Sequence, residues 1–95
     1  MKLEFRQTVT CNHLTLARVC KTIDWQQPLP RCGEYVAGLD TLDGEQELPV
    51  RKLLHRVQDG SCLAELPGFN IAQLRFSYRE LEQLAAQKGW ILQKL

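Results

Sequence analysis

The strongest constraint on the fold is a short segment near the C-terminus, because it carries the signals that begin and end a helix. Ser77 and Glu80 are spaced as a capping box, in which each side chain can bond the backbone N–H of the other residue. Gly89 supplies the left-handed residue that commonly closes a helix. The sequence therefore predicts an amphipathic helix over 78–88 whose apolar face packs on a core.

The length and composition of the chain fit a single small domain. It has 95 residues, of which 44% are hydrophobic and 24% charged, close to the averages of globular proteins. At this size, folding buries roughly 60–70% of the surface of the unfolded chain, which is enough for one hydrophobic core. We therefore expect one globular domain spanning residues 1–95.

No segment has the composition of a membrane anchor or an export signal. None approaches the ~18 consecutive apolar residues that a membrane-spanning helix needs. Residues 1–6 alternate apolar and charged side chains and lack the apolar centre of a signal peptide. We expect a cytoplasmic protein with no membrane partner, in which the cysteines are free thiols. These are Cys11, Cys20, Cys32 and Cys62.

Two segments near the N-terminus have different periodicities. Residues 2–10 alternate apolar and polar side chains, which predicts a half-buried strand. In residues 13–24 the apolar side chains recur at helical spacing, which predicts a helix. Residues 25–30 contain two prolines and are expected to form an ordered, extended connector. The expected apolar face of the helix consists of Leu16, Val19, Cys20 and Ile23.

The acidic segment 34–47 supports two interpretations. The apolar residues of 34–42 fit one face of a helix, but they also fit a strand that would turn at Asp43-Gly44, a dipeptide common in hairpins. Gly38 weakens both interpretations, and the two stay open. The segment has no basic residue, which favours an acidic side suited to a charged partner. Its acidic residues are Glu34, Asp40, Asp43, Glu45 and Glu47.

Residues 49–58 have a clear helical periodicity. Their apolar residues recur at i, i+3, i+4 and i+7 and would form a stripe roughly 100° wide. Pro49 suits the first turn of a helix and Gly60 would end it. The stripe consists of Val50, Leu53, Leu54 and Val57, and the opposite side of Arg51, Lys52, His55 and Arg56.

The last third of the chain is expected to contain two strands, the capped helix and a final strand. Residues 61–66 and 69–76 have the composition of strands, joined by a tight turn at Pro67-Gly68. Residues 90–92 form the expected last strand. The predicted order is β-α-(α or β)-α-β-β-α-β. The predicted fold class is thus α+β, with three short helices packed on a small, mostly antiparallel sheet.

The sequence contains no recognisable catalytic or metal-binding pattern. Cys11 and His13 form one Cys-x-His pair, but zinc sites usually present two close pairs, and Cys20 and Cys32 are scattered beyond it. No P-loop, zincin or nucleophile-elbow motif occurs. We expect a protein that is not an enzyme and that holds no metal and no cofactor.

The basic side of the predicted helix 49–58 makes DNA binding the alternative function. If 34–42 is helical, the order of elements resembles the outline of a winged helix, with 49–58 in the recognition position. The formal net charge of +1 and the adjacent acidic segment argue against this alternative, because neither attracts phosphates.

We therefore expect a small regulatory or adaptor domain that acts by binding another protein, since a domain of this size leaves little room for a deep pocket. Homodimerisation through an exposed sheet edge or apolar patch is a further candidate. The expected binding surface is the basic side of 49–58 with two further arginines: Arg51, Lys52, His55, Arg56, Arg75 and Arg79.

Overall fold

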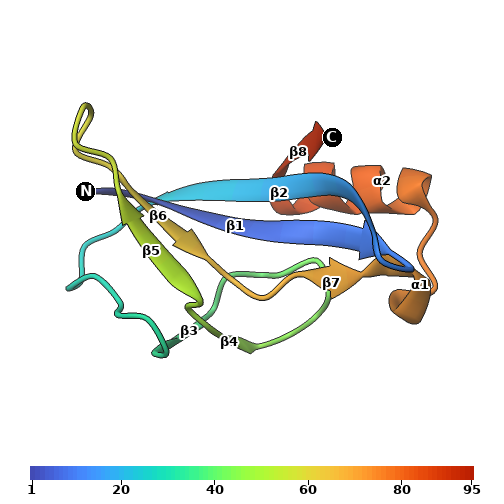
Figure 1. Ribbon diagram of the computed structural model, residues 1–95, viewed down its shortest axis with the longest axis horizontal. Coiled ribbons are helices and arrows are strands. Elements are labelled where there is room, and N and C mark those ends of the chain that lie inside the picture. Colours follow the sequence, from blue (N-terminus) through green and yellow to red (C-terminus); the bar gives the residue numbers. More distant parts are fainter.

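Strands dominate the computed structural model, which describes all 95 residues (Figure 1). They hold 43% of the residues, whereas two helices hold 16%. A mixed α+β class is compatible with this content. The predicted arrangement of three helices on a small sheet is wrong, because two of the segments expected to be helical are paired as strands.

The centre of the fold is a long antiparallel hairpin of β1 (Lys2–Cys11) and β2 (Leu14–Asp24). Asn12 and His13 form its two-residue turn, both with positive φ, as tight hairpin turns require. The strand predicted over 2–10 is confirmed. Its inward side chains are all fully buried, and they are Leu3, Phe5, Gln7 and Val9.

The helix predicted over 13–24 is wrong, because this segment is β2. Of the four residues expected on its apolar face, only Val19 is fully buried, whereas Ala17, which was not among them, is buried beside it. The helical spacing therefore has no structural meaning here. The segment pairs with β1 along its whole length, which satisfies the hydrogen-bonding groups of its backbone. Such tertiary pairing overrides the local preference for a helix.

The main sheet has the order β5-β6-β1-β2-β8. It adds β5 (Lys52–His55), β6 (Cys62–Glu65) and β8 (Ile91–Lys94) to the hairpin. β6 runs parallel to β1, and the other neighbours are antiparallel. The final strand is therefore confirmed, with its start one residue later than predicted. β5 and β8 are the two edges of the sheet.

The hairpin predicted at Pro67-Gly68 is wrong. β6 and β7 (Phe69–Asn70) both lie parallel to β1, one after the other along the same edge. Between them the chain leaves the ladder, and Gln7 Nε2 donates to the Pro67 carbonyl at 3.0 Å. A Cβ on Gly68 would lie 2.5 Å from the Thr8 carbonyl oxygen. Only glycine at position 68 therefore allows the two backbones to approach this closely.

The strand predicted over 69–76 extends only through β7. The chain then forms α1 (Ile71–Leu74), a single turn capped by Asn70, whose side chain accepts from the N–H of Ala72 at 3.0 Å. Arg75 closes the turn in the left-handed conformation. An Asx cap of this kind redirects the backbone away from the sheet.

The helix predicted over 49–58 is also wrong. β3 (Tyr35–Ala37) pairs with β4 (Glu47–Pro49) in a separate two-stranded sheet, and the next residues form β5. Half of the expected stripe is not in a core, since Val57 is 94% exposed. For 34–42, the strand interpretation is the correct one, although the chain turns over a longer loop than the predicted dipeptide.

The helix predicted over 78–88 is confirmed as α2 (Tyr78–Lys88). Ser77 Oγ accepts from the N–H of Glu80 at 3.1 Å and contacts the Glu80 carboxylate at 3.2 Å. Gly89 adopts φ +78°, and the N–H of Trp90 donates to the Ala85 carbonyl at 2.9 Å. Neither helix of the protein is long and apolar enough to cross a membrane.

One face of the main sheet is covered and the other is open. A single core cluster joins the inward side chains of β1 to Leu81 of α2 and to Val36 and Leu48 of the two-stranded sheet. The alternate side chains of β1, such as Glu4 and Arg6, are only half-buried and lie on the opposite side. We call that uncovered side the open face.

We predict that Ser77→Ala destabilises the protein by about 0.5–2 kcal/mol, because the first turn of α2 loses its N-cap acceptor. Gly89→Ala should cost about 1–2 kcal/mol, because a Cβ is disfavoured in the left-handed region. Urea unfolding of both variants measures these changes. Unfolding midpoints equal to that of the wild type would show that the caps contribute nothing.

We predict that Gly68→Ala destabilises the protein by about 1–3 kcal/mol, because the added Cβ collides with a backbone atom of β1 that has no freedom to move. Amide exchange should accelerate most in β7 and in the facing part of β1. A variant with wild-type stability would disprove the close approach of the two strands.

Candidate functional site

The basic residues expected on one helix face are dispersed by the strand. Lys52 and His55 point to opposite sides of β5, opposite Glu65 and Cys62 respectively. Arg56 pairs with Glu4 at 3.2 Å across the open face, and this hydrogen bond raises the pKa of Arg56 above its ordinary value. No common basic surface results.

The other two predicted residues lie at the far end of the molecule. Arg75 ends α1 and Arg79 lies in the first turn of α2, whereas β5 lies at the opposite end of the long axis (Figure 1). The winged-helix alternative loses its premise, because 49–58 contains no helix to enter a groove. The six predicted residues, Arg51, Lys52, His55, Arg56, Arg75 and Arg79, do not form one site.

The thiols and imidazoles are also separated. Cys11 and His13 lie at the tip of the β1–β2 hairpin, Cys20 lies in the middle of β2, and Cys32 follows the proline connector. No group of three or more Cys, His, Asp or Glu side chains is arranged to hold a metal ion. The positions named as metal candidates therefore do not converge.

Two of the thiols have surroundings that work against nucleophilic chemistry. Cys62 Sγ lies 3.3 Å from His55 Nδ1, but the thiol is buried. Burial raises the pKa of Cys20, and the neighbouring Glu4 carboxylate raises it further. Both effects keep this thiol protonated at neutral pH, whereas the thiolate is the reactive form.

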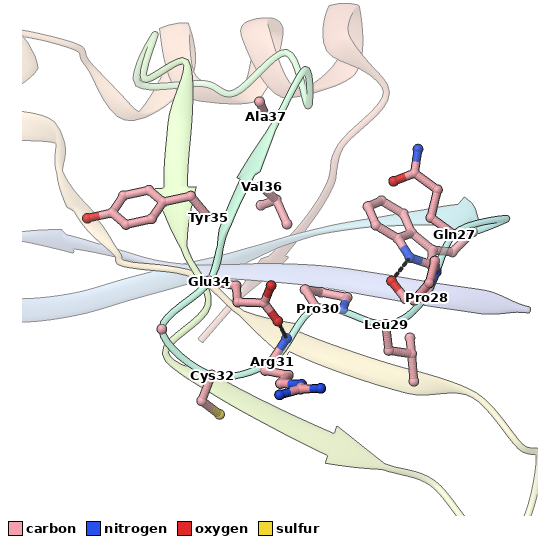
Figure 2. A pocket seen from close by; sticks show the side chains of 12 residues that line it. Gln27, Pro28, Leu29, Pro30, Arg31, Cys32, Glu34, Tyr35, Val36 and Ala37 are labelled. Carbon is pink, nitrogen blue, oxygen red and sulfur yellow. Dashed lines mark hydrogen bonds between the residues drawn. The ribbon is translucent and has the colours of Figure 1, made fainter.

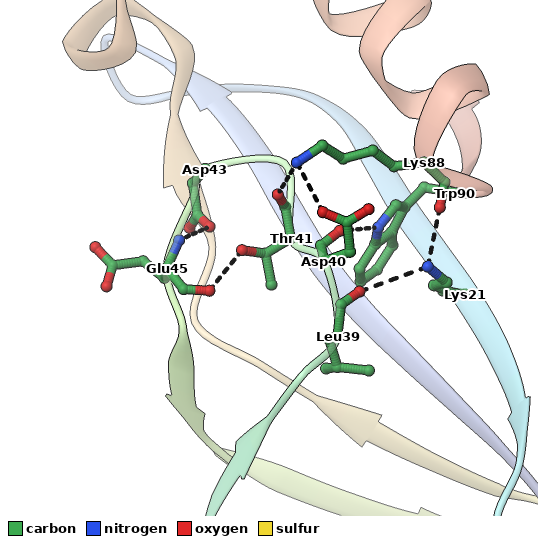
Figure 3. Close-up of polar contacts among 8 residues, drawn as sticks. All are labelled: Lys21, Leu39, Asp40, Thr41, Asp43, Glu45, Lys88 and Trp90. Atoms are coloured by element: carbon green, nitrogen blue, oxygen red, sulfur yellow. Dashed lines mark hydrogen bonds and ion pairs between the residues drawn. The ribbon is translucent and has the colours of Figure 1, made fainter.

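The acidic loop that follows β3 is held by two lysines (Figure 3). Lys88 Nζ pairs with the Asp40 carboxylate at 3.0 Å and donates to the Thr41 carbonyl at 3.0 Å. Lys21 Nζ donates to the Lys88 carbonyl at the end of α2 at 2.9 Å, and Trp90 Nε1 donates to the Asp40 carbonyl at 3.1 Å. The loop is thus fastened to α2, and part of its charge is neutralised within the protein.

The largest hollow of the protein lies beside β3 (Figure 2). It has a volume of about 980 Å³, and half of its twelve lining residues are hydrophobic. Residues 25–34 form one side and β3 forms the other. We call this hollow the β3 groove. It lies at the surface outside the core, so it is compatible with the expectation that a domain of this size leaves little room for a deep pocket.

The connector side of the β3 groove is well ordered. Trp25 packs edge-on against Phe5 with ring centroids 5.7 Å apart, and its Nε1 donates to the Pro28 carbonyl at 3.1 Å. Glu34 accepts from the N–H of Arg31 at 2.7 Å. These contacts confirm the ordered connector predicted from its prolines.

The β3 side of the groove presents unpaired backbone groups. The N–H of Val50 donates to the Glu34 carbonyl at 2.8 Å, and Val36 lies opposite Leu48 in the same ladder. Alternate residues of a strand direct their N–H and C=O to opposite sides. The backbone groups of Tyr35 and Ala37 therefore point away from β4, and Figure 2 shows the connector on that side.

The side chains of β3 complete the groove. Val36 is buried beneath it, whereas Tyr35 is 67% exposed on the other side of the strand. The sequence signals were present, namely the two prolines and a tyrosine in a short apolar segment. They could not identify the site, because whether residues 34–42 form a helix or an edge strand depends on β4.

Comparisons of the chain with protein-family models, curated proteins and solved structures found no significant match.

We predict an order of alkylation for three of the four thiols. Cys32 is exposed in the β3 groove and should react first, Cys20 should react more slowly because its raised pKa depletes the thiolate, and Cys62 should react only after unfolding. Peptide mass spectrometry during iodoacetamide treatment at neutral pH measures the order. Equal rates for Cys20 and Cys32 would contradict it.

Proposed function

We propose that the protein is a non-enzymatic regulatory or adaptor module that binds an extended segment of a partner protein along the free edge of β3. The observation that carries the proposal is the direction of the Tyr35 and Ala37 backbone groups, which face the largest hollow of the molecule. An extended segment can pair with such an edge as an additional strand.

The hydrogen bonds of strand addition do not depend on sequence, so selectivity must come from side chains. Every second side chain of the added segment would point toward Val36 and the connector, where Leu29 and Pro30 provide apolar contacts. The partner segment should therefore carry apolar residues at alternate positions and no proline at the positions that pair with β3.

Three features of the β3 groove favour binding. The connector is already held by the hydrogen bonds of Trp25 and Glu34, so little ordering has to accompany association. Tyr35 presents a large exposed ring next to the free edge, and tyrosine is one of the residues that dominate binding energy at protein interfaces. Arg31 makes no ion pair and can bind an acidic residue of the partner.

A substitution of the outward-facing backbone donor tests the proposal. Short random peptides displayed on phage serve as the probe and are selected on the wild-type protein. Ala37→Pro should weaken the selected peptides by about tenfold or more, because it removes an N–H that bonds the peptide and none that bonds β4. Ala37→Ser keeps this N–H and is the matched control.

Amide hydrogen exchange locates the bound peptide on the strand. In the free protein, Tyr35 and Ala37 should exchange quickly and Val36 slowly. A selected peptide should protect Tyr35 and Ala37 and leave Val36 unchanged. A library that yields no binder, or binders that tolerate Ala37→Pro and protect other strands, would overturn the proposed function.

A further inference from the structure

β8 is an edge of the main sheet with no neighbour on its outer side. In Figure 1 it lies beside the middle of β2, close to the C-terminus. Such an edge presents a row of unpaired N–H and C=O groups, which a second strand can use. The other edge, β5, is different, because it begins with Lys52, and lysines on edge strands discourage pairing.

The direction of the β8 backbone groups follows from one hydrogen bond. The N–H of Leu95 donates to the Leu16 carbonyl at 3.0 Å, and the β2–β8 ladder has the same register. In an antiparallel pair, every second residue bonds the neighbouring strand. Ile91, Gln93 and Leu95 therefore bond β2, and Leu92 and Lys94 direct their backbone groups outward.

The side chains of β8 include two exposed apolar residues. Ile91 is 69% exposed and Leu95 is 59% exposed, although both are large and hydrophobic. Ile91 and Gln93 line the open face together with Cys20, so the odd-numbered side chains of β8 lie on that face. Gln93 lies midway between Ile91 and Leu95 in the sequence. Two antiparallel copies of β8 that are centred on Gln93 would therefore place each Ile91 opposite a Leu95.

We propose that β8 is a homodimer interface, in which two copies pair antiparallel about a two-fold axis at Gln93. In this register, Leu92 of each copy lies opposite Lys94 of the other copy. The two residues of each such pair form two N–H···O bonds with their outward-directed backbone groups. Ile91 of each copy then lies opposite Leu95 of the other copy. Each exposed apolar side chain thereby gains an apolar neighbour across the axis.

The neighbouring register fits less well. An axis at Leu92 places Ile91 opposite Gln93 and leaves Leu95 without a neighbour. It also requires backbone groups of Trp90, whose N–H already donates to Ala85. Self-complementarity is required of any two-fold interface, because the same surface serves both copies. An axis at Lys94 would place the two Lys94 residues opposite each other and Gln93 opposite Leu95, so the axis at Gln93 is the one that pairs the exposed apolar side chains with one another.

Lys94 would protect the edge if its charge lay over it, since lysines on edge strands discourage pairing. Its ammonium instead lies 5.8 Å from the centre of the Tyr78 ring of its own chain. The charge is thus drawn toward α2 and leaves the backbone edge accessible. The proposal does not rest on the β3 groove, which belongs to the smaller sheet.

Charge substitutions test both the interface and its register. Ile91→Lys and Leu95→Glu should each shift the protein toward monomer in sedimentation equilibrium, by about tenfold in the dissociation constant. The double variant should recover the dimer, because each new lysine faces a new glutamate of the second copy. The two positions lie too far apart along one strand to pair within a monomer.

Disulfide trapping provides a second test of the same register. Gln93→Cys should give a covalent dimer under mild oxidation, because the two Cα atoms face each other across the axis as a non-hydrogen-bonded pair. Ile91→Cys, which faces Leu95 of the second copy, should not. Each comparison is made with the native exposed Cys32 replaced by serine.

The outcomes that overturn the proposal are definite. Wild-type protein that stays monomeric up to about 1 mM has no interface of useful strength. Crosslinking of Ile91→Cys but not of Gln93→Cys would exclude the register. A double charge variant that is as monomeric as the single variants would show that residue 91 does not face residue 95 of the second copy. Circular dichroism shows that each variant stays folded.

Discussion

The fold depends on β1 being paired along both of its edges. β2 bonds one edge, while β6 and β7 share the other. The inward side chains of β1 are fully buried, and α2 and the two-stranded sheet pack against them. The other strands of the main sheet are therefore positioned, directly or through one neighbour, by the hydrogen bonds of residues 2–11, whereas α2 and the two-stranded sheet are held by packing in the core.

The parallel pairing along this edge of β1 is interrupted between β6 and β7. The N–H of Leu66 still donates to the Arg6 carbonyl at 2.9 Å, but the ladder resumes only at Phe69, and the Pro67 carbonyl has no ladder partner. Gln7 replaces that partner from within the core, at the cost of burying its own Oε1 without a hydrogen bond. A polar residue in the most buried row of the sheet is thus explained by the interrupted strand beside it.

Local signals predicted the elements whose sequence pattern agrees with their final caps and burial. The capping residues Ser77 and Gly89 identify α2, and the alternation of 2–10 identifies β1. The spacing of Val50, Leu53, Leu54 and Val57 resembles a helix, but pairing with β6 decided the structure of β5, and no local pattern reports such a partner. For the same reason the proline connector could be predicted, whereas the free edge of β3 could not.

The parallel pairing of β1 with β6 has a consequence for how the chain reaches its native state. The two strands are separated by most of the sequence, so the central strand cannot be enclosed until the last third of the chain is available. Contacts of this kind slow folding, because a long loop must close before they form. During synthesis the first hairpin would leave the ribosome with one edge of its central strand bare. That edge stays exposed until the second half of the chain is available, and an uncovered strand edge promotes aggregation.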